Sequence, residues 1–186
     1  MTFKPVHDPT HLYFITATIL GWVKLFEAPP YAKIILDSLD WHRSHGRWQL
    51  YAYVVMPNHI HAIIKPCADY TVSGVLQSFG SFTAHAILKR LRETHQTVLL
   101  AHFAQRQDRD KRKAHQIWQP LQAKNVWSEA FLRQKLEYIH NNPVAKGWEL
   151  VDNRADYEYS SACFHDCGRT PVVAVDDVRE CFGLGV

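Results

Sequence analysis

Residues 53–65, YVVMPNHIHAIIK, are the stretch that decides the fold predicted from this sequence. Two apolar runs are separated by Met-Pro-Asn, and both runs are rich in the aromatic and β-branched residues typical of strands. A Pro-Asn pair between two such runs favours a tight turn. The sequence therefore predicts a β-hairpin with arms over residues 48–56 and 60–64.

Two histidines, His59 and His61, stand one residue apart at the start of the second arm. Because successive side chains of a strand point to opposite faces, both imidazoles lie on one face, separated by about 6 to 7 Å of strand rise. Two interpretations remain open. The pair can be ordinary half-buried histidines of a sheet, or it can be two ligands of one metal ion, which would need a third ligand from elsewhere in the chain.

The elements around the hairpin follow from local patterns. Residues 11–20 alternate as a strand does, and Pro29-Pro30 opens an amphipathic helix over residues 31–45. A second helix is predicted from residue 71 or 73 to residue 93 by its apolar spacing. The order strand, helix, strand, strand, helix indicates a mixed α and β domain.

The segment after the second helix is harder to interpret. Order becomes uncertain over residues 96–116, since residues 104–116 (AQRQDRDKRKAHQ) contain five basic, two acidic and few apolar residues. That composition fits a solvated surface loop or fraying helix as well as a loop that contacts phosphates. Pro120 restricts residues 117–127 to an edge strand, whose tryptophans are either core residues or platforms for base stacking.

A third helix is predicted from an N-cap at Ser128 to Pro143. Leu132, Leu136 and Ile139 would form its buried face. Tyr138 lies about 200° around the helix from Leu136, beside Asn142 four residues later. A tyrosine and an asparagine thus share a face outside the core, either as surface residues or as functional ones.

Length and composition indicate one domain over residues 1–186, with a core over about residues 11–162 and a C-terminal tail over residues 163–186. The net charge of +3 permits a polyanionic partner. No signal peptide and no apolar run of about 20 residues is found, so we expect a soluble, cytoplasmic protein. In a reducing compartment the four scattered cysteines are expected to be free thiols. Cys163, His165 and Cys167 lack the second pair that would complete a zinc site, so we do not expect one there.

The hairpin AYVVMPNHIHAII, the helix LEYIHNNPVAKGW and the later DYEYSSA together resemble the REP-associated tyrosine transposases, relatives of the single-tyrosine HUH transposases of bacterial insertion sequences. The resemblance covers about residues 13–162. It implies an α+β fold of the ferredoxin-like or RRM-like HUH nuclease type. Its antiparallel sheet would have four or five strands with helices on one face, and the histidines would lie on the opposite side near the nucleophile helix. It also implies that His59, His61 and Asn142 hold Mg²⁺ or Mn²⁺, and that Tyr138 is the nucleophile.

The function implied by the resemblance is cleavage and rejoining of single-stranded, hairpin-containing DNA of the REP type through a 5′-phosphotyrosine. Nucleic-acid contacts are expected from Asn58, Lys111, Arg112, Lys113 and Trp118. Two alternatives are a domesticated, non-catalytic DNA-hairpin binding protein and a metal-dependent phosphoesterase that uses water. A monomer with its site in cis and a homodimer that exchanges tyrosine helices both remain open. Lys135 and His140 are the nearby groups that could assist deprotonation of Tyr138.

Overall fold

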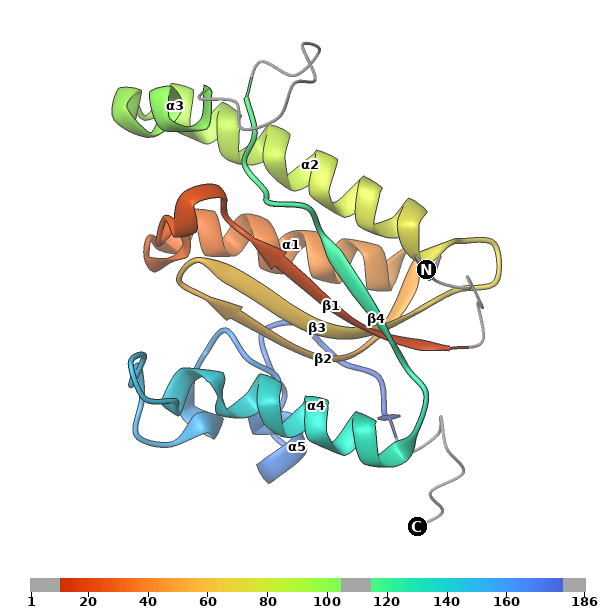
Figure 1. Cartoon of the computed structure of the whole chain (residues 1–186). Coiled ribbons are helices and arrows are strands. Elements are labelled where there is room, and N and C mark those ends of the chain that lie inside the picture. The colour runs from red at the N-terminus through yellow and green to blue at the C-terminus, as the bar shows by residue number, and fades with distance from the viewer. Residues whose placement is uncertain (1–10, 105–114, 179–186) are drawn as a thin grey trace, which may run out of the picture.

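A four-stranded antiparallel sheet forms the centre of the protein (Figure 1). The computed structural model describes residues 11–104 and 115–178. The strand order is β2-β3-β1-β4, with these bounds: β1 Leu12–Thr18, β2 Trp48–Met56, β3 His59–Pro66 and β4 Gln122–Val126. The predicted hairpin and the α+β class with an antiparallel sheet are thereby confirmed, since β2 and β3 pair around the Pro57-Asn58 turn.

Helices lie on both sides of this sheet (Figure 1). Their bounds are α1 Pro29–Ser44, α2 Val72–Glu93, α3 Thr97–Ala104, α4 Glu129–Asn141 and α5 Ala162–Cys167. Short 3-10 turns occupy Leu20–Trp22, Leu25–Glu27, Asn142–Val144 and Arg154–Asp156. Helices α1 and α2 cover one face, while α4 and α5 lie across the other (Figure 1). The helix that carries Tyr138 is thus on the side opposite α1 and α2.

The alternation of side chains along β3 divides the interior into two apolar clusters. Ile60, Ala62 and Ile64 belong to the cluster beneath α1 and α2. Ile63 belongs to the cluster beneath α4, so His59 and His61, which precede it by four and two residues, also face α4. A slip of one residue in the register would move both histidines to the other face.

Strand β4 is an edge strand, as Pro120 predicts, but Trp118 before it is not a surface residue. The indole is buried, its Nε1 donates a hydrogen bond to Thr83 Oγ1 at 3.0 Å, and its ring lies 5.9 Å from that of Phe26. The expectation that Trp118 contacts nucleic acid is therefore wrong, because its ring faces are occupied by the core. Burial of this large apolar ring stabilises the fold, and that gain outweighs the exposure expected for a residue just before an edge strand.

The expectation of uncertain order over residues 96–116 is also wrong for residues 97–104. Residues Thr97–Ala104 form α3, and Phe103 is completely buried in the same cluster as Trp118. The basic residues that made this helix difficult to predict follow it directly in the sequence. Lys111, Arg112 and Lys113 lie outside the described residues, so their expected DNA contacts stay predictions.

The chain remains packed beyond the expected boundary at residue 162. Val173 joins the core, where its backbone N–H donates to Tyr53 Oη at 3.0 Å. Asp176 accepts hydrogen bonds from the Leu50 backbone N–H and from Arg43. The first part of the tail thus contributes to the fold through contacts to β2 and α1.

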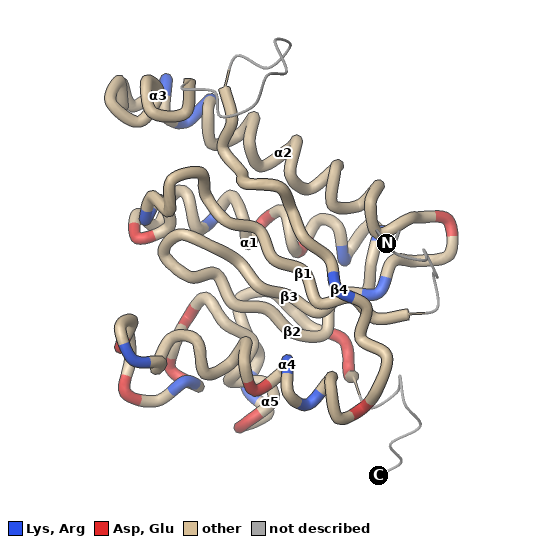
Figure 2. The backbone as a smooth tube through the Cα atoms, in the orientation of Figure 1, with Lys and Arg blue, Asp and Glu red and all other residues tan. Residues whose placement is uncertain are grey.

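Charged residues lie mainly on helices and loops, as Figure 2 shows. Within the four strands the only charged residues are Lys65 on β3 and Lys124 on β4. Among the described helices, none is long and apolar enough to span a bilayer.

Candidate active site

His59 and His61 stand side by side on the α4 face of the sheet. Their ring centroids are 4.8 Å apart with an interplanar angle of 70°. Both side chains are almost completely buried. Burial lowers the pKa of both imidazoles, that of His61 to about 3. At neutral pH both rings are therefore uncharged, which is the form that binds metal ions.

Each imidazole is oriented through its Nδ1 atom. His59 Nδ1 lies 2.7 Å from Asn58 Oδ1, and His61 Nδ1 lies 2.9 Å from Thr16 Oγ1. The Asn58 amide is fixed in turn, because its Nδ2 donates to the carbonyl oxygen of Trp22. Such partners commonly fix the ring of a metal-binding histidine. They leave the two Nε2 atoms as the nitrogens available to a ligand.

Asn58 and Thr16 therefore have a role that the sequence did not indicate. Asn58 was expected to contact DNA, but it is buried and positions His59 instead. Thr16 stands directly opposite His61 in the pairing of β1 with β3. That register joins strands 45 residues apart, so no local pattern could reveal it.

Tyr138 lies beside His61, with 5.0 Å between the ring centroids. Phe14 stacks on His61 at 5.1 Å and meets the Tyr138 ring edge-on at 6.0 Å. Helix α4 begins at its predicted cap, where Ser128 Oγ accepts from the Phe131 backbone N–H. The phenol is 48% exposed, so a substrate can reach it from solvent.

Asn142 links the tyrosine helix to the histidines. Its Nδ2 donates to the backbone carbonyl of Tyr138 at 2.9 Å, and its side chain lies close enough to His59 to oppose the lowering of that imidazole's pKa by burial. His59, His61, Tyr138 and Asn142 thus meet in one place, although β3 and α4 are about 70 residues apart.

The donor atoms fit a divalent cation. The neutral imidazole of His59 has one N–H and one nitrogen lone pair, and it lies beside two amides, the oxygen of Asn58 and the side chain of Asn142. A cation held by His59, His61 and Asn142 would satisfy a nitrogen lone pair and an amide oxygen together. The described residues contain no group of three His, Cys, Asp or Glu side chains that could hold a metal. In the set of His59, His61 and Asn142, the amide oxygen of Asn142 would be the third ligand.

Of the two groups considered for deprotonating Tyr138, only Lys135 lies beside it. Lys135 Nζ is 5.3 Å from the centre of the Tyr138 ring and 4.7 Å from that of Phe14. His140 is buried on the opposite side of α4, where its Nε2 lies 3.1 Å from Ser161 Oγ. Burial lowers the pKa of His140 to about 3, and the residue is part of the packing of α4.

An ionic cluster around Arg154 fixes the end of α4 that carries Tyr138. The guanidinium donates two hydrogen bonds to Asp166, one to Glu137 at 2.6 Å and one to Asn141 at 3.1 Å. Glu137 and Asn141 belong to α4, whereas Arg154 and Asp166 belong to the C-terminal segment. Helix α4 is thereby attached to the C-terminal segment of the same chain, through contacts that no local sequence pattern indicates.

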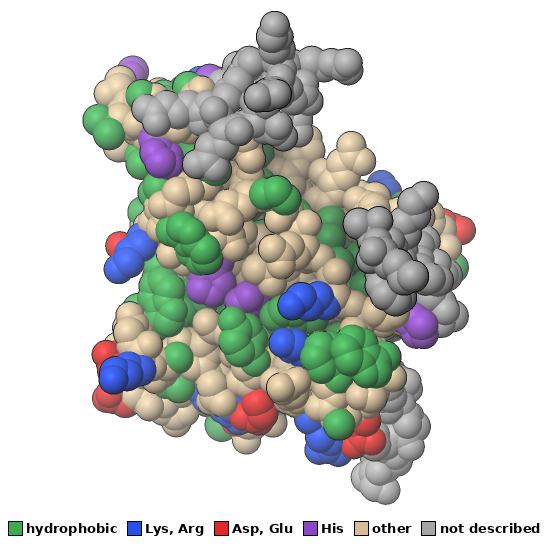
Figure 3. Space-filling model, viewed as in Figure 1, with side chains coloured by type: hydrophobic (Ala, Val, Ile, Leu, Met, Phe, Trp, Pro, Cys, Tyr) green, Lys and Arg blue, Asp and Glu red, His purple; other side chains and the backbone are tan. Residues whose placement is uncertain are grey.

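The surface around this site combines hydrophobic, basic and histidine side chains. Figure 3 shows two adjacent histidine side chains near the centre of this face, with hydrophobic and Lys or Arg side chains beside them. Acidic side chains lie mainly toward its lower and left margins (Figure 3). A shallow depression beside α4 is lined by Gln134, Glu137, Tyr138, Asn141, Asn142 and Ala145.

Comparison with known proteins gives one family and two structures. The family described as "Transposase IS200 like" matches residues 25–107, which include both histidines. No curated protein sequence matches the chain. A solved REP-associated tyrosine transposase bound to a REP hairpin is 19% identical, with a TM-score of 0.64 over 96% of this chain and 93% of that one. A protein assigned as a transposase from Deinococcus radiodurans R1 is 15% identical, with a TM-score of 0.48 over 76% of this chain and 95% of that one.

The first of these structures shares the fold, including the four-stranded antiparallel sheet with its helices. The family match covers the hairpin with His59 and His61, helices α1 and α2, and the loop before them. Residues 25–107 are thus similar to the IS200-like transposase family, and the chain has the fold of a REP-associated tyrosine transposase.

Proposed function

We propose that this protein is a metal-dependent transposase that cleaves and rejoins single-stranded DNA at hairpins of the REP type. The observation that carries the proposal is the position of Tyr138, 5.0 Å from His61 ring to ring within the same chain. Asn142 donates to the backbone carbonyl of Tyr138 and lies beside His59, which supports placing the proposed nucleophile and ligand set in one site.

His59, His61 and Asn142 would hold Mg²⁺ or Mn²⁺. When bound, the ion polarises the scissile phosphate and stabilises the negative charge of the transition state. All three side chains are uncharged at neutral pH, so they would not neutralise the charge of the bound ion. Its positive charge would remain available to attract the anionic phosphate. Asn58 and Thr16 keep both imidazoles in the orientation that this binding needs.

Tyr138 would supply the nucleophile. Its phenolic oxygen attacks the phosphorus, a new P–O bond to tyrosine forms, and the bond from phosphorus to the 3′ oxygen breaks. The phenol loses its proton and the leaving strand ends in a 3′-OH, while the 5′ phosphate stays on Tyr138. Attack by a DNA 3′-OH on the phosphotyrosine reverses the step, so strands can be rejoined without ATP.

The hairpin substrate is supported by the likeness to a transposase that is bound to a REP hairpin. The site itself favours a single strand, because Tyr138 is exposed beside aromatic and basic side chains on an open surface. Action in cis is supported by the Arg154 cluster, which joins α4 to the C-terminal segment of the same chain.

The test uses single-stranded hairpin DNA from the flanks of the protein's own gene, labelled at the 5′ or the 3′ end, with Mg²⁺ or Mn²⁺. We expect a covalent protein–DNA adduct on a denaturing gel that requires metal and disappears in Tyr138→Phe. Binding without an adduct would instead support a non-catalytic hairpin-binding protein. Cleavage that persists in Tyr138→Phe would identify water, as in a phosphoesterase, or another residue as the nucleophile.

A further inference from the structure

An exposed aromatic pair stands at the N-terminal end of α4. Trp127 is 69% exposed and stacks on Phe131, with ring centroids 4.3 Å apart and an interplanar angle of 13°. Phe131 supports one face of the indole, and the high exposure leaves the rest open to solvent. A large apolar ring held in this way is a platform on which another flat ring can stack.

Two lysines border this platform. Lys124 on β4 pairs with Phe14 across the strands, so its side chain is on the α4 face. Lys135 Nζ lies 4.7 Å from the Phe14 ring and 5.2 Å from the Phe131 ring. Within the described part of the chain neither lysine forms an ion pair, whereas Arg133 on the same helix is paired with Glu129. Both ammonium groups remain available to an anion.

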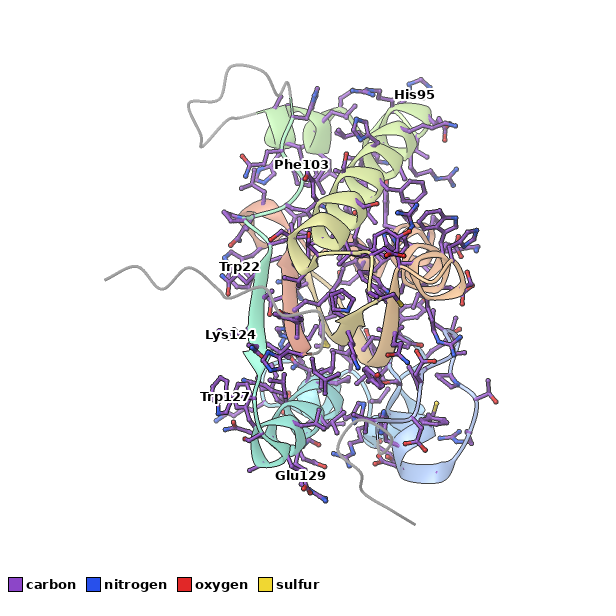
Figure 4. The ribbon with its side chains drawn as sticks, turned by 90° about the vertical axis from the view of Figure 1, so that its right-hand side faces the viewer. Trp22, His95, Phe103, Lys124, Trp127 and Glu129 are labelled. Atoms are coloured by element: carbon purple, nitrogen blue, oxygen red, sulfur yellow. The ribbon has the colours of Figure 1, made fainter. Side chains whose placement is uncertain are left out.

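These residues lead continuously to the nucleophile. Phe131, Lys135 and Tyr138 follow at spacings of four and three, which places them on one face of α4. Lys135 Nζ is also within 5.3 Å of the Tyr138 ring. Figure 4 shows that Trp127 and Lys124 project from the same side of the molecule. We name the surface formed by Trp127, Phe131, Lys124 and Lys135 the α4 track.

We infer that the α4 track binds an unpaired segment of the DNA strand next to the scissile phosphate. A base would stack on Trp127, and Lys124 and Lys135 would contact phosphates. Bases within a duplex are already stacked on their neighbours, so an open indole selects a single strand rather than the hairpin stem. The inference deepens the proposed function, because it states where the strand at that same site would run.

The length of the α4 track sets the number of nucleotides between the stacked base and the cleaved phosphate. Seven residues separate Phe131 from Tyr138, which corresponds to about 10 Å of helix. Stacked nucleotides rise about 3.4 Å each along a strand, so about three nucleotides span this distance. The base on Trp127 is therefore expected about three nucleotides from the phosphate that Tyr138 attacks.

The experiment measures binding in EDTA, so that cleavage does not contribute. Labelled hairpins carry no arm, a 5′ arm or a 3′ arm of single-stranded DNA from the flanks of the gene. Trp127→Ala should weaken binding of one armed hairpin at least about fivefold and leave the bare hairpin unchanged. Trp127→Phe should retain most of the affinity, and Lys124→Met should lower the salt dependence of binding by about one phosphate contact.

Phe82→Ala is the matched control. Phe82 is 58% exposed on α2, across the sheet from the track, and its loss should leave every affinity unchanged. An abasic site about three nucleotides from the cleaved phosphate should abolish the difference between Trp127→Ala and wild type. Equal loss on bare and armed hairpins, no loss at all, or the same loss in Phe82→Ala would overturn the inference.

The same experiment separates the track from the chemistry. Dependence on Trp127 without any covalent adduct in the cleavage assay would reject the proposed function and keep the track. An adduct with unchanged binding by Trp127→Ala would reject the track and keep the proposed function.

Discussion

The rings of His61 on β3 and Tyr138 on α4 lie 5.0 Å apart in one chain, although 77 residues separate them in sequence. The contact exists because β3 directs alternate side chains toward α4, and α4 buries Leu132 and Ile139 while Tyr138 stays at the edge of that interface. The proposed site would then be complete within one chain, which has consequences that can be measured.

Mixing two inactive variants tests whether the site acts in cis. We expect His61→Ala and Tyr138→Phe each to form no adduct, and an equimolar mixture of them to stay inactive, because each chain lacks one part of its own site. Adduct formation on a denaturing gel is the measurement, after co-refolding to allow exchange of subunits. Recovery of activity in the mixture would show that α4 of one subunit serves the histidines of another.

Loss of the Arg154 cluster should destabilise the protein and slow cleavage. The guanidinium is mostly buried and hydrogen-bonds to Asp166, Glu137 and Asn141, so Arg154→Met leaves two acidic groups without their partner. We expect the free energy of unfolding in urea to fall by about 2 kcal/mol. The rate of adduct formation should fall more than DNA affinity, since the end of α4 that carries Tyr138 is no longer fixed.

Arg133→Met is the control for that experiment. Arg133 is an exposed residue of the same helix, and its pair with Glu129 is of the solvated i, i+4 kind. We expect a change below about 0.5 kcal/mol in stability and no change in the rate of adduct formation. If both arginine variants behave alike, the Arg154 cluster has no special role in holding α4.

The two tryptophans near β4 should contribute very differently to stability. Trp118 is buried and hydrogen-bonded to Thr83, so Trp118→Ala should lower the free energy of unfolding by about 3 to 5 kcal/mol. Trp127 is exposed, so Trp127→Ala should change it by less than about 0.5 kcal/mol. Urea titrations followed by circular dichroism measure both values, and similar losses in the two variants would contradict the assignment of Trp118 to the core.

The free energy of unfolding should decrease as the pH falls below about 6.5, the ordinary pKa of histidine, in part because of His42. This residue is buried in α1, its Nδ1 donates to the Ser38 carbonyl at 2.8 Å, and its ring stacks on Trp48. Burial lowers its pKa in the folded state, with smaller contributions from the charges of Arg47 and His45. The unfolded chain then binds the proton more readily below a pH of about 6.5, so acid favours unfolding.

The variant His42→Phe tests this contribution. It keeps a ring against Trp48 but removes the titrating group. The difference in the free energy of unfolding between pH 7.5 and pH 5.5 should be smaller in the variant than in the wild type. An identical pH dependence would show that His42 does not titrate differently in the folded and unfolded states.

The parts of the site that the sequence predicts are those set by local periodicity. The strand period places His59 and His61 on one face, and the helix period separates Tyr138 from the buried Leu132 and Ile139. Both patterns depend only on neighbours within a few residues, so they can be recognised without knowledge of the fold. The α+β class follows from the same local signals in order along the chain.

The parts that the sequence does not predict depend on contacts between distant segments. Thr16 meets His61 only through the register of β1 with β3, and Arg154 meets Glu137 only after the C-terminal segment packs on α4. Trp118 and Trp127 belong to the same short segment, yet one is in the core and the other on the surface. Tertiary packing decides such cases, and residue type does not distinguish them.

The most direct test of the account is to identify the residue that becomes linked to DNA. Trypsin releases residues 136–146 after Lys135 and Lys146, and this peptide contains Tyr138 as its single tyrosine. After reaction with hairpin DNA and nuclease trimming, mass spectrometry should find the nucleotide on this peptide, and only when Mg²⁺ or Mn²⁺ is present. A nucleotide on a different peptide, or cleaved DNA without any linked peptide, would contradict the assignment of Tyr138 as the nucleophile.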